Sequence, residues 1–151
     1  MPEALLETLG PAALTYLEQL PDKMEMHDLL CYVRLAETKN LPETMRERMM
    51  NKLRRAMGVT VERDPAAWKT YGLQPLAVVT TPDSPFAALF GRELEANLDV
   101  LVESQQDDGC WGLTWTWGDL FPEAWRVAER DWRGVLTLTN LRTLRSFGRL
   151  E

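Results

Sequence analysis

Tryptophan is the residue type of this chain that points most directly to ligand binding. Five of the six tryptophans lie between Trp111 and Trp132, and the spacing Trp111-x3-Trp115-x-Trp117 forms the centre of the group. Indole rings supply large apolar faces that hold apolar, cationic or sugar-like ligands. We therefore expect Trp111, Trp115, Trp117 and Trp125 to line an aromatic ligand pocket. The same rings are also able to fill the core of a short helical domain, and the sequence leaves that alternative open.

Acidic side chains surround the same segment and are the groups there that could transfer protons. Two facing carboxylates carry out acid–base chemistry, for example in glycoside hydrolysis. Asp108 and Asp119 are the catalytic candidates by this reasoning. Solvated loop acids and helix caps are the alternative explanation for the group as a whole, which comprises Asp107, Asp108, Asp119, Glu123, Glu129 and Asp131.

Cysteine and histidine are too scarce for a zinc site. The chain has two cysteines, Cys31 and Cys110, and one histidine, His27, with no CxxC pair. A zinc site built from these residue types needs more ligands than that. We therefore expect no metal and no cofactor, and free thiols in a reducing, cytoplasmic setting.

The composition is that of an ordinary globular protein. With 151 residues, of which 45% are hydrophobic and 26% charged, the chain suits one helical domain over residues 1–151. A formal net charge of −6 disfavours nucleic-acid binding, because phosphate neutralisation requires a basic surplus. The N-terminus lacks the basic and apolar regions of a signal peptide, and no apolar run is long enough to span a membrane.

Apolar periodicity predicts an all-α chain of helical hairpins. The spacing predicts two short helices before Pro21, separated at Gly10-Pro11, a helix capped within residues 22–25, and a methionine-rich helix from Pro42 to Gly58. The basic side chains of that last helix, from Arg46 to Arg55, are expected on a solvated face. Short helical turns near residues 65 and 85 follow, with an extended segment as an option at 76–81. Further helices are expected at 92–104, 122–130 and 132–147.

One segment resembles a known motif. Leu101, Gln105, Gly109 and Trp111 match the pattern L-x3-Q-x(2–5)-G-x-W, the QW motif of squalene and oxidosqualene cyclases and of prenyltransferase-like repeats. Those proteins are α/α toroids, in which helical hairpins form a ring around a cavity. The whole C-terminal half of the chain also looks like the C-terminal part of uncharacterised bacterial prenyltransferase-like proteins. In that family the motif is structural, so the resemblance implies a fold and not an activity.

The resemblance shapes the functional expectation. About three hairpins are too few for a complete ring, so we expect a partial toroid with an exposed apolar edge that associates with a second copy as a homo-oligomer. The catalytic signatures of the family, DxDD and DDxxD, do not occur. We expect a non-catalytic or accessory module that binds a small apolar or sugar-like ligand. The alternatives are a terpenoid cyclase or prenyltransferase-type enzyme using Asp108 or Asp119, and a carbohydrate-active fragment.

Overall fold

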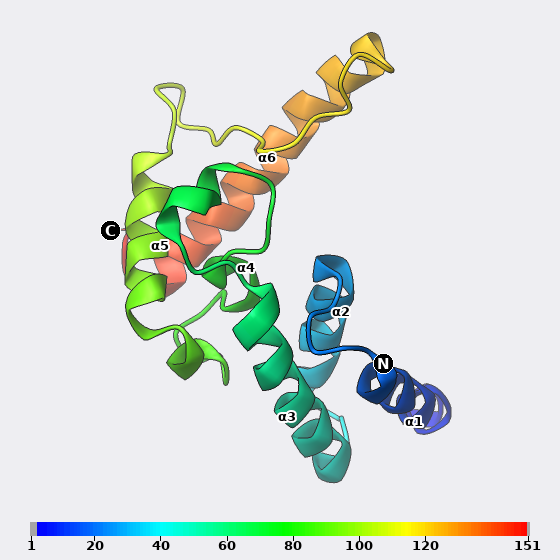
Figure 1. The fold of residues 1–151 in the computed structure, drawn as a ribbon. Helices are drawn as coiled ribbons and strands as arrows, with labels where there is room; N and C mark the ends of the chain where they lie inside the picture. Colours follow the sequence, from blue (N-terminus) through cyan, green and yellow to red (C-terminus); the bar gives the residue numbers. More distant parts are fainter. Residues whose placement is uncertain (1–2, 151) are drawn as a thin grey trace. The chain divides into compact units, whose positions relative to one another are not determined.

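Helices account for all the regular structure of the described chain. The computed structural model describes residues 3–150, with side chains from Ala4 onward. Over that range it contains six α-helices and two short 3-10 helices, and no strand, as Figure 1 shows. The predicted all-α class is confirmed. None of the helices in this range combines the length and the apolar character needed to cross a lipid bilayer.

The chain divides into two compact units, residues 1–62 and residues 63–151. Each unit contains its own buried apolar residues. The expectation of one domain over residues 1–151 stays a prediction, and so does the partial α/α toroid.

The N-terminal unit consists of three helices, α1 (Glu3–Gln19), α2 (Met26–Ala36) and α3 (Glu43–Thr60). Helix α3 packs against both of the others. It buries Met49, Leu53 and Met57, and the helix continues to Thr60, past Gly58, where the sequence suggested an end. The fully or nearly fully buried side chains of this unit include Leu14, Leu17, Leu29, Val33, Met49, Leu53 and Met57.

Helix α1 continues without interruption through Gly10-Pro11, so the predicted break there is wrong. A proline inside a helix removes one hydrogen bond and costs about 3 kcal/mol. Leu6, Leu14 and Leu17 stay in phase on one helical face across the proline, and all three are buried. The gain from burying this continuous face exceeds the cost of the proline.

Polar side chains of α3 tie the unit together. Arg46 donates to the carbonyls at the C-terminal end of α2, including that of Thr38 at 2.7 Å, and Arg48 pairs with Glu18 of α1 at 2.6 Å. Lys52 is 6% exposed and binds the Leu20 carbonyl and Asp22, the latter at 2.7 Å. The expectation of a solvated basic face is therefore wrong for Lys52, because its ammonium group satisfies buried acceptors.

The capping arrangement before α2 also differs from the expected one. Glu25 itself caps the helix, accepting hydrogen bonds from the backbone N–H groups of His27 at 2.6 Å and Asp28 at 3.2 Å. Asp22, expected to start a capping box, instead pairs with Lys52 and with Arg55. Asp22 therefore binds two cationic side chains in place of a backbone N–H group, because a cation holds a carboxylate more strongly than a neutral N–H does.

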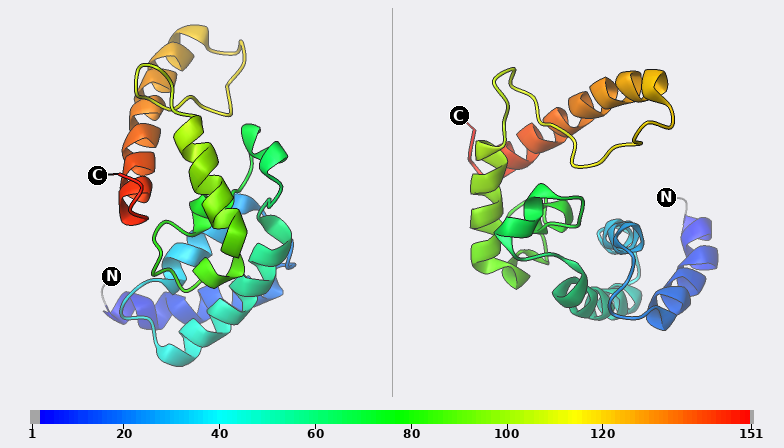
Figure 2. Two further views of the ribbon diagram at one scale, coloured as in Figure 1. Left: turned by 90° about the vertical axis from the view of Figure 1, so that its left-hand side faces the viewer. Right: turned by 45° about the horizontal axis from the view of Figure 1, so that its top comes forward.

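The C-terminal unit consists of η1 (Pro65–Lys69), α4 (Pro75–Val78), η2 (Ala87–Leu89), α5 (Gly91–Glu103) and α6 (Pro122–Ser146). The segment considered for an extended form is the short helix α4 followed by irregular backbone. Residues 122–130 and 132–147, predicted as two helices, form one, since no breaker separates Arg130 from Trp132. Figure 2 shows the α5–α6 connection running out to the N-terminal end of α6, from which α6 returns toward α5.

A buried amide organises the start of this unit. Asn97 of α5 is 2% exposed; it donates to the Gln74 side chain at 3.0 Å and accepts from the Leu76 backbone N–H at 3.0 Å. Nearby, Arg63 lies over the Phe90 ring at 4.8 Å and donates to Glu93 at 2.8 Å. These contacts fix η1 and α4 against α5, because buried polar groups must be satisfied.

We predict that Asp22 stabilises the N-terminal unit in a pH-dependent way. The hydrogen bond from Lys52 lowers the pKa of Asp22 below its ordinary value. A carboxyl with a lowered folded-state pKa contributes stability above its unfolded pKa of about 3.9, and this contribution is lost as the pH falls through the folded value. The melting temperature of the wild type should therefore exceed that of Asp22→Asn near neutral pH, and the gap should close below about pH 4.

Circular-dichroism melts of both proteins between neutral and acidic pH measure this difference. Asp83→Asn, at an exposed position of the C-terminal unit, is the matched control and should show a smaller gap. A gap for Asp22→Asn that keeps its size at low pH would contradict the role given to the ion pair.

Candidate functional site

The segment that resembles the QW motif forms a closed turn at the end of α5. Gly109 has a φ of +80°, a conformation that glycine adopts without steric cost. The Gln105 side chain donates to the Gly109 carbonyl at 2.9 Å, and the Gly109 N–H donates to the Gln106 carbonyl at 2.8 Å. Gln105 and Gly109 therefore form the turn together: the Gln105 side chain closes it, and Gly109 supplies its backbone conformation.

Trp111 folds back from this turn into the core. It is 4% exposed and packs with Leu98 of α5 and Leu144 of α6. Its indole N–H donates to the carbonyl of Leu101 at 2.8 Å, at the end of α5. Because both the ring and its polar atom are used in packing, Trp111 acts as the anchor of the connection between α5 and α6.

An arginine of α6 holds the same turn from the other side. Arg133 donates to the Gln106 side chain at 2.7 Å and to Asp108 at 2.6 Å. The Cys110 backbone N–H donates to the other oxygen of Asp108 at 3.0 Å. This backbone hydrogen bond and then Arg133 lower the pKa of Asp108. The carboxylate is thus kept ionised, which is the opposite of what a general acid near neutral pH requires.

Four tryptophans form a second, separate group, which we call the tryptophan cluster: Trp115, Trp117, Trp125 and Trp132. The ring centroids of Trp115 lie 5.2 Å from those of Trp125 and 5.6 Å from those of Trp132, with interplanar angles of 61° and 80°. Trp117 lies 5.3 Å from Trp125 at an angle of 51°. The two contacts of Trp115 are edge-to-face, a preferred aromatic geometry, and the Trp117–Trp125 pair is tilted.

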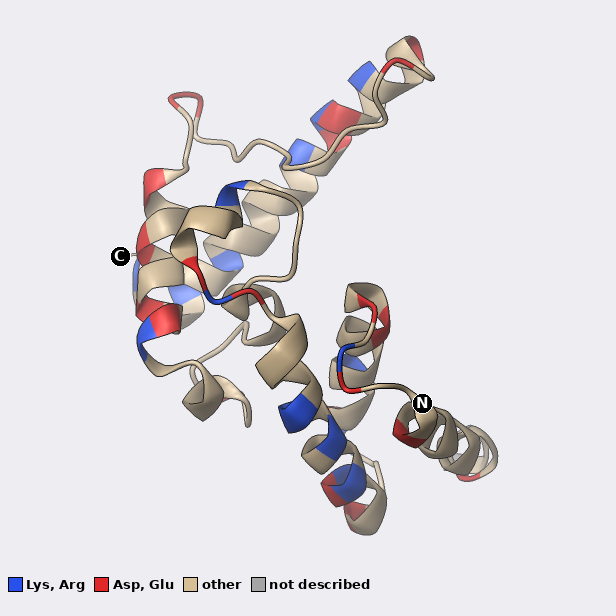
Figure 3. Ribbon diagram, in the orientation of Figure 1, with Lys and Arg blue, Asp and Glu red and all other residues tan. Residues whose placement is uncertain are grey.

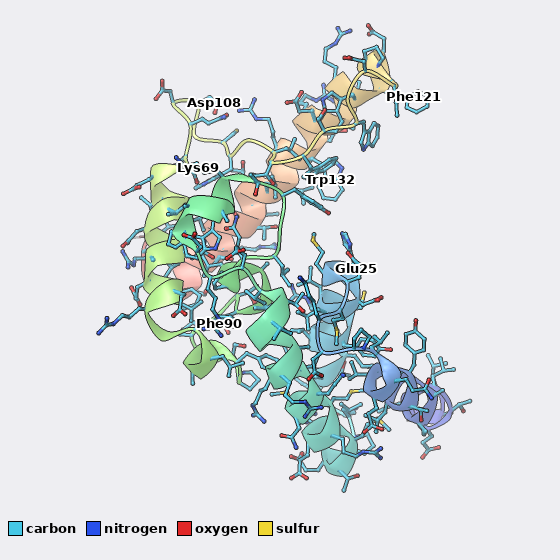
Figure 4. The ribbon with its side chains drawn as sticks, viewed as in Figure 1. Glu25, Lys69, Phe90, Asp108, Phe121 and Trp132 are labelled. Atoms are coloured by element: carbon cyan, nitrogen blue, oxygen red, sulfur yellow. The ribbon has the colours of Figure 1, made fainter. Side chains whose placement is uncertain are left out.

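The cluster is only partly buried. Trp117 is 42% exposed and Trp132 is 44% exposed, while Trp115 and Trp125 are half-buried. Leu120 and Phe121, which complete the connection, are 78% and 64% exposed. Figure 4 shows Phe121 at the N-terminal end of α6 and Trp132 farther along this helix, with Asp108 at the other end of the connection. Exposed apolar groups of this size on one short stretch are typical of a binding surface.

The structure brings together three of the four tryptophans expected to line a pocket. Trp115, Trp117 and Trp125 are in the cluster, whereas Trp111 is in the core and shares no described ring contact with them. Trp132 is the fourth member of the cluster, although the sequence predicted only that a helix begins there. Its spacing of seven residues from Trp125 is a signal for this, since residues two turns apart share a helical face.

The two acidic candidates are not brought together as a catalytic pair. Asp108 is bound by Arg133, while Asp119 is exposed, and its side chain makes no ion pair within residues 3–150. In the same range no group of three or more histidine, cysteine or acidic side chains is arranged to hold a metal ion.

Two surface hollows lie in the N-terminal unit and not at the tryptophans, and the larger of these two has a volume of about 410 Å³. It is lined by one helix alone, α3, through Glu43, Arg46, Glu47, Met50, Asn51 and Arg54. The smaller, about 250 Å³, lies between α1 and α3. A hollow lined by one helix is an open surface depression, so the partly exposed aromatic rings remain the candidate site.

Comparison with known proteins adds no family to this description: no protein-family model, no curated protein and no solved structure matches the chain.

We predict that truncation of a core tryptophan destabilises the protein more than truncation of a tryptophan in the cluster. Trp111→Ala removes a buried ring and should lower the free energy of unfolding by about 3–5 kcal/mol. Trp117→Ala removes a ring that is 42% exposed and should cost less than about 1.5 kcal/mol. Urea denaturation followed by circular dichroism measures both values. Equal losses for the two variants would show that the cluster is part of the core.

Proposed function

We propose that this protein is a non-catalytic binding module whose tryptophan cluster holds a small apolar or sugar-like ligand. The observation that carries the proposal is the partial exposure of Trp117 and Trp132, at 42% and 44%, within a group of indoles that contact one another. A group of rings that served only as core would be buried as Trp111 is. Indole faces left open to solvent are suited to stacking on an apolar or sugar ring.

The position of the cluster supports the same function. Its members come from the connection after α5 and from the first half of α6, and the connection is anchored at Trp111 and Arg133. The backbone that presents the rings is therefore held at one end by the core. A site held by packed elements loses less conformational entropy on binding than a free loop does.

The enzyme alternative, a terpenoid cyclase or prenyltransferase-type activity, has no comparable support. Such an activity needs a group that donates a proton, and the sequence analysis named Asp108 or Asp119 for it. Arg133 and the Cys110 N–H hold Asp108 in its ionised form. Asp119 is exposed to solvent, and bulk water weakens the electrostatic effects on which such catalysis depends.

The proposal also covers the type of fold, the oligomeric state and the cellular location. We propose that the chain is a partial α/α toroid, that it associates with a second copy, and that it is cytoplasmic. The turn at Gln105, Gly109 and Trp111 supports the first point, since these residues do the structural work implied by the resemblance. The free thiols of Cys31 and Cys110 are in keeping with a reducing compartment.

We predict that ligand binding depends on the exposed members of the cluster. Farnesol, as an apolar probe, and cellobiose, as a sugar probe, are titrated against the intrinsic tryptophan fluorescence of the full chain. One of the two should change the emission saturably, and Trp117→Ala and Trp132→Ala should each weaken that binding by about tenfold or more. Trp68→Phe is the matched control, since Trp68 is buried in η1, and it should leave the affinity unchanged.

The outcome also separates the ligand classes. A response to farnesol alone assigns an apolar ligand, and a response to cellobiose alone assigns a sugar. If neither probe binds, or if the control loses as much affinity as the cluster variants do, the proposed function is wrong.

A further inference from the structure

Helix α6 carries a solvent-exposed stripe on a face that its own unit leaves open. The stripe consists of residues three or four positions apart: Val127, Asp131, Val135, Leu138, Arg142 and Arg145. At 100° per residue, these six fall within an arc of about 80° on the helix. Val127, Val135 and Leu138 are 54%, 52% and 51% exposed, and Leu141 beside them is 37% exposed.

The charges of this stripe are distributed in a self-complementary way. Its apolar centre, Val135 and Leu138, is flanked by Asp131 on the N-terminal side and by Arg142 on the C-terminal side. Figure 3 shows that the acidic residues of α6 lie in its N-terminal half, while the other end carries only basic residues. Asp131 and Arg142 are equally far along the helix from the midpoint between Val135 and Leu138.

The cations of the stripe form no ion pair with the described residues of their own unit. Within residues 3–150, neither Arg142 nor Arg145 takes part in a described ion pair. Asp131 contacts only the neighbouring Arg130, at 3.0 Å, and its side chain stays 64% exposed. The stripe therefore offers one acid and two bases to a partner, arranged around an apolar centre.

We propose that this stripe is the surface on which two copies of the chain associate, with their α6 helices packed antiparallel. The two-fold axis passes between Val135 and Leu138, so each Val135 faces the partner's Leu138. The same symmetry places Asp131 opposite the partner's Arg142, twice per dimer. A parallel pairing would instead put Asp131 against the partner's Asp131 and Arg142 against the partner's Arg142, which like-charge repulsion disfavours.

A glycine on the flank of the stripe suits this packing. Gly134 lies in the interior of α6, and a Cβ placed on it would meet no atom within 4 Å. Glycine inside a helix is destabilising, so its presence at an open position calls for a reason. In the antiparallel dimer Gly134 lies next to the partner's Leu138, where the missing side chain lets the two helices approach closely.

This inference rests on the self-association in the proposed function and not on the ligand. Its test is sedimentation velocity of the full chain over a range of concentrations, comparing the wild type with three charge variants. Asp131→Arg and Arg142→Asp should each weaken the dimer by about tenfold or more, because each converts two attractive contacts to repulsive ones. The double variant Asp131→Arg/Arg142→Asp recreates the pairs with reversed sign and should restore dimerisation.

The double variant shows whether a single variant loses the dimer through its interface contacts or through misfolding. A second charge reversal would restore lost interface contacts but would not rescue a misfolded protein. Leu138→Glu should abolish the dimer, while the matched control Leu9→Glu, at a leucine of α1 that is 54% exposed, should leave it intact. If the wild type dimerises and none of these variants weakens the dimer, or only Leu9→Glu does, the pairing through α6 is wrong, although the chain does self-associate. If the wild type is a monomer, both the pairing through α6 and the proposed self-association are wrong.

The ligand proposal does not depend on this experiment, because the fluorescence titrations test it separately.

Discussion

The hydrogen bond from the Trp111 indole to the Leu101 carbonyl is the interaction on which the C-terminal unit depends. It joins the end of α5 to a ring that packs on Leu98 and Leu144. A carbonyl at the end of a helix lacks an intrahelical partner and must find another donor. The buried Trp111 indole supplies that donor, so the same residue satisfies the end of α5 and packs in the core of the unit. The connection to α6 begins from this fixed position.

The two ends of α6 consequently have different surroundings. Its C-terminal end is fastened by buried Leu144, by the Ser146 hydroxyl donating to the Thr80 carbonyl at 2.8 Å, and by Arg149, which pairs with Glu95 and Asp99 of α5. In its N-terminal half, Trp125, Trp132 and Arg133 contact the connection that carries Trp115 and Trp117. The half of the helix with less core around it is therefore the half that presents aromatic rings to solvent.

The N-terminal unit is held by a different balance of forces. Its helices bury methionine, leucine and valine side chains, and α3 adds cations that satisfy the carbonyls and carboxylates of its neighbours. Lys52 combines apolar burial with hydrogen bonding: its aliphatic stem is buried, and its ammonium group donates to the Leu20 carbonyl and to Asp22. A charge so far from solvent is tolerated because each of its contacts is an acceptor.

The sequence by itself determined the helical class and the position of α5, because both follow from the local periodicity of apolar side chains. It did not decide that α1 continues through Pro11, that α6 is a single helix, or that Lys52 is buried. In the first and last cases the outcome depends on contacts between helices, whose free energy outweighs a local preference. Only the tertiary structure separated Trp111 from the other indoles and added Trp132 to them, because the placement of a ring in core or at the surface is set by neighbours distant in the chain.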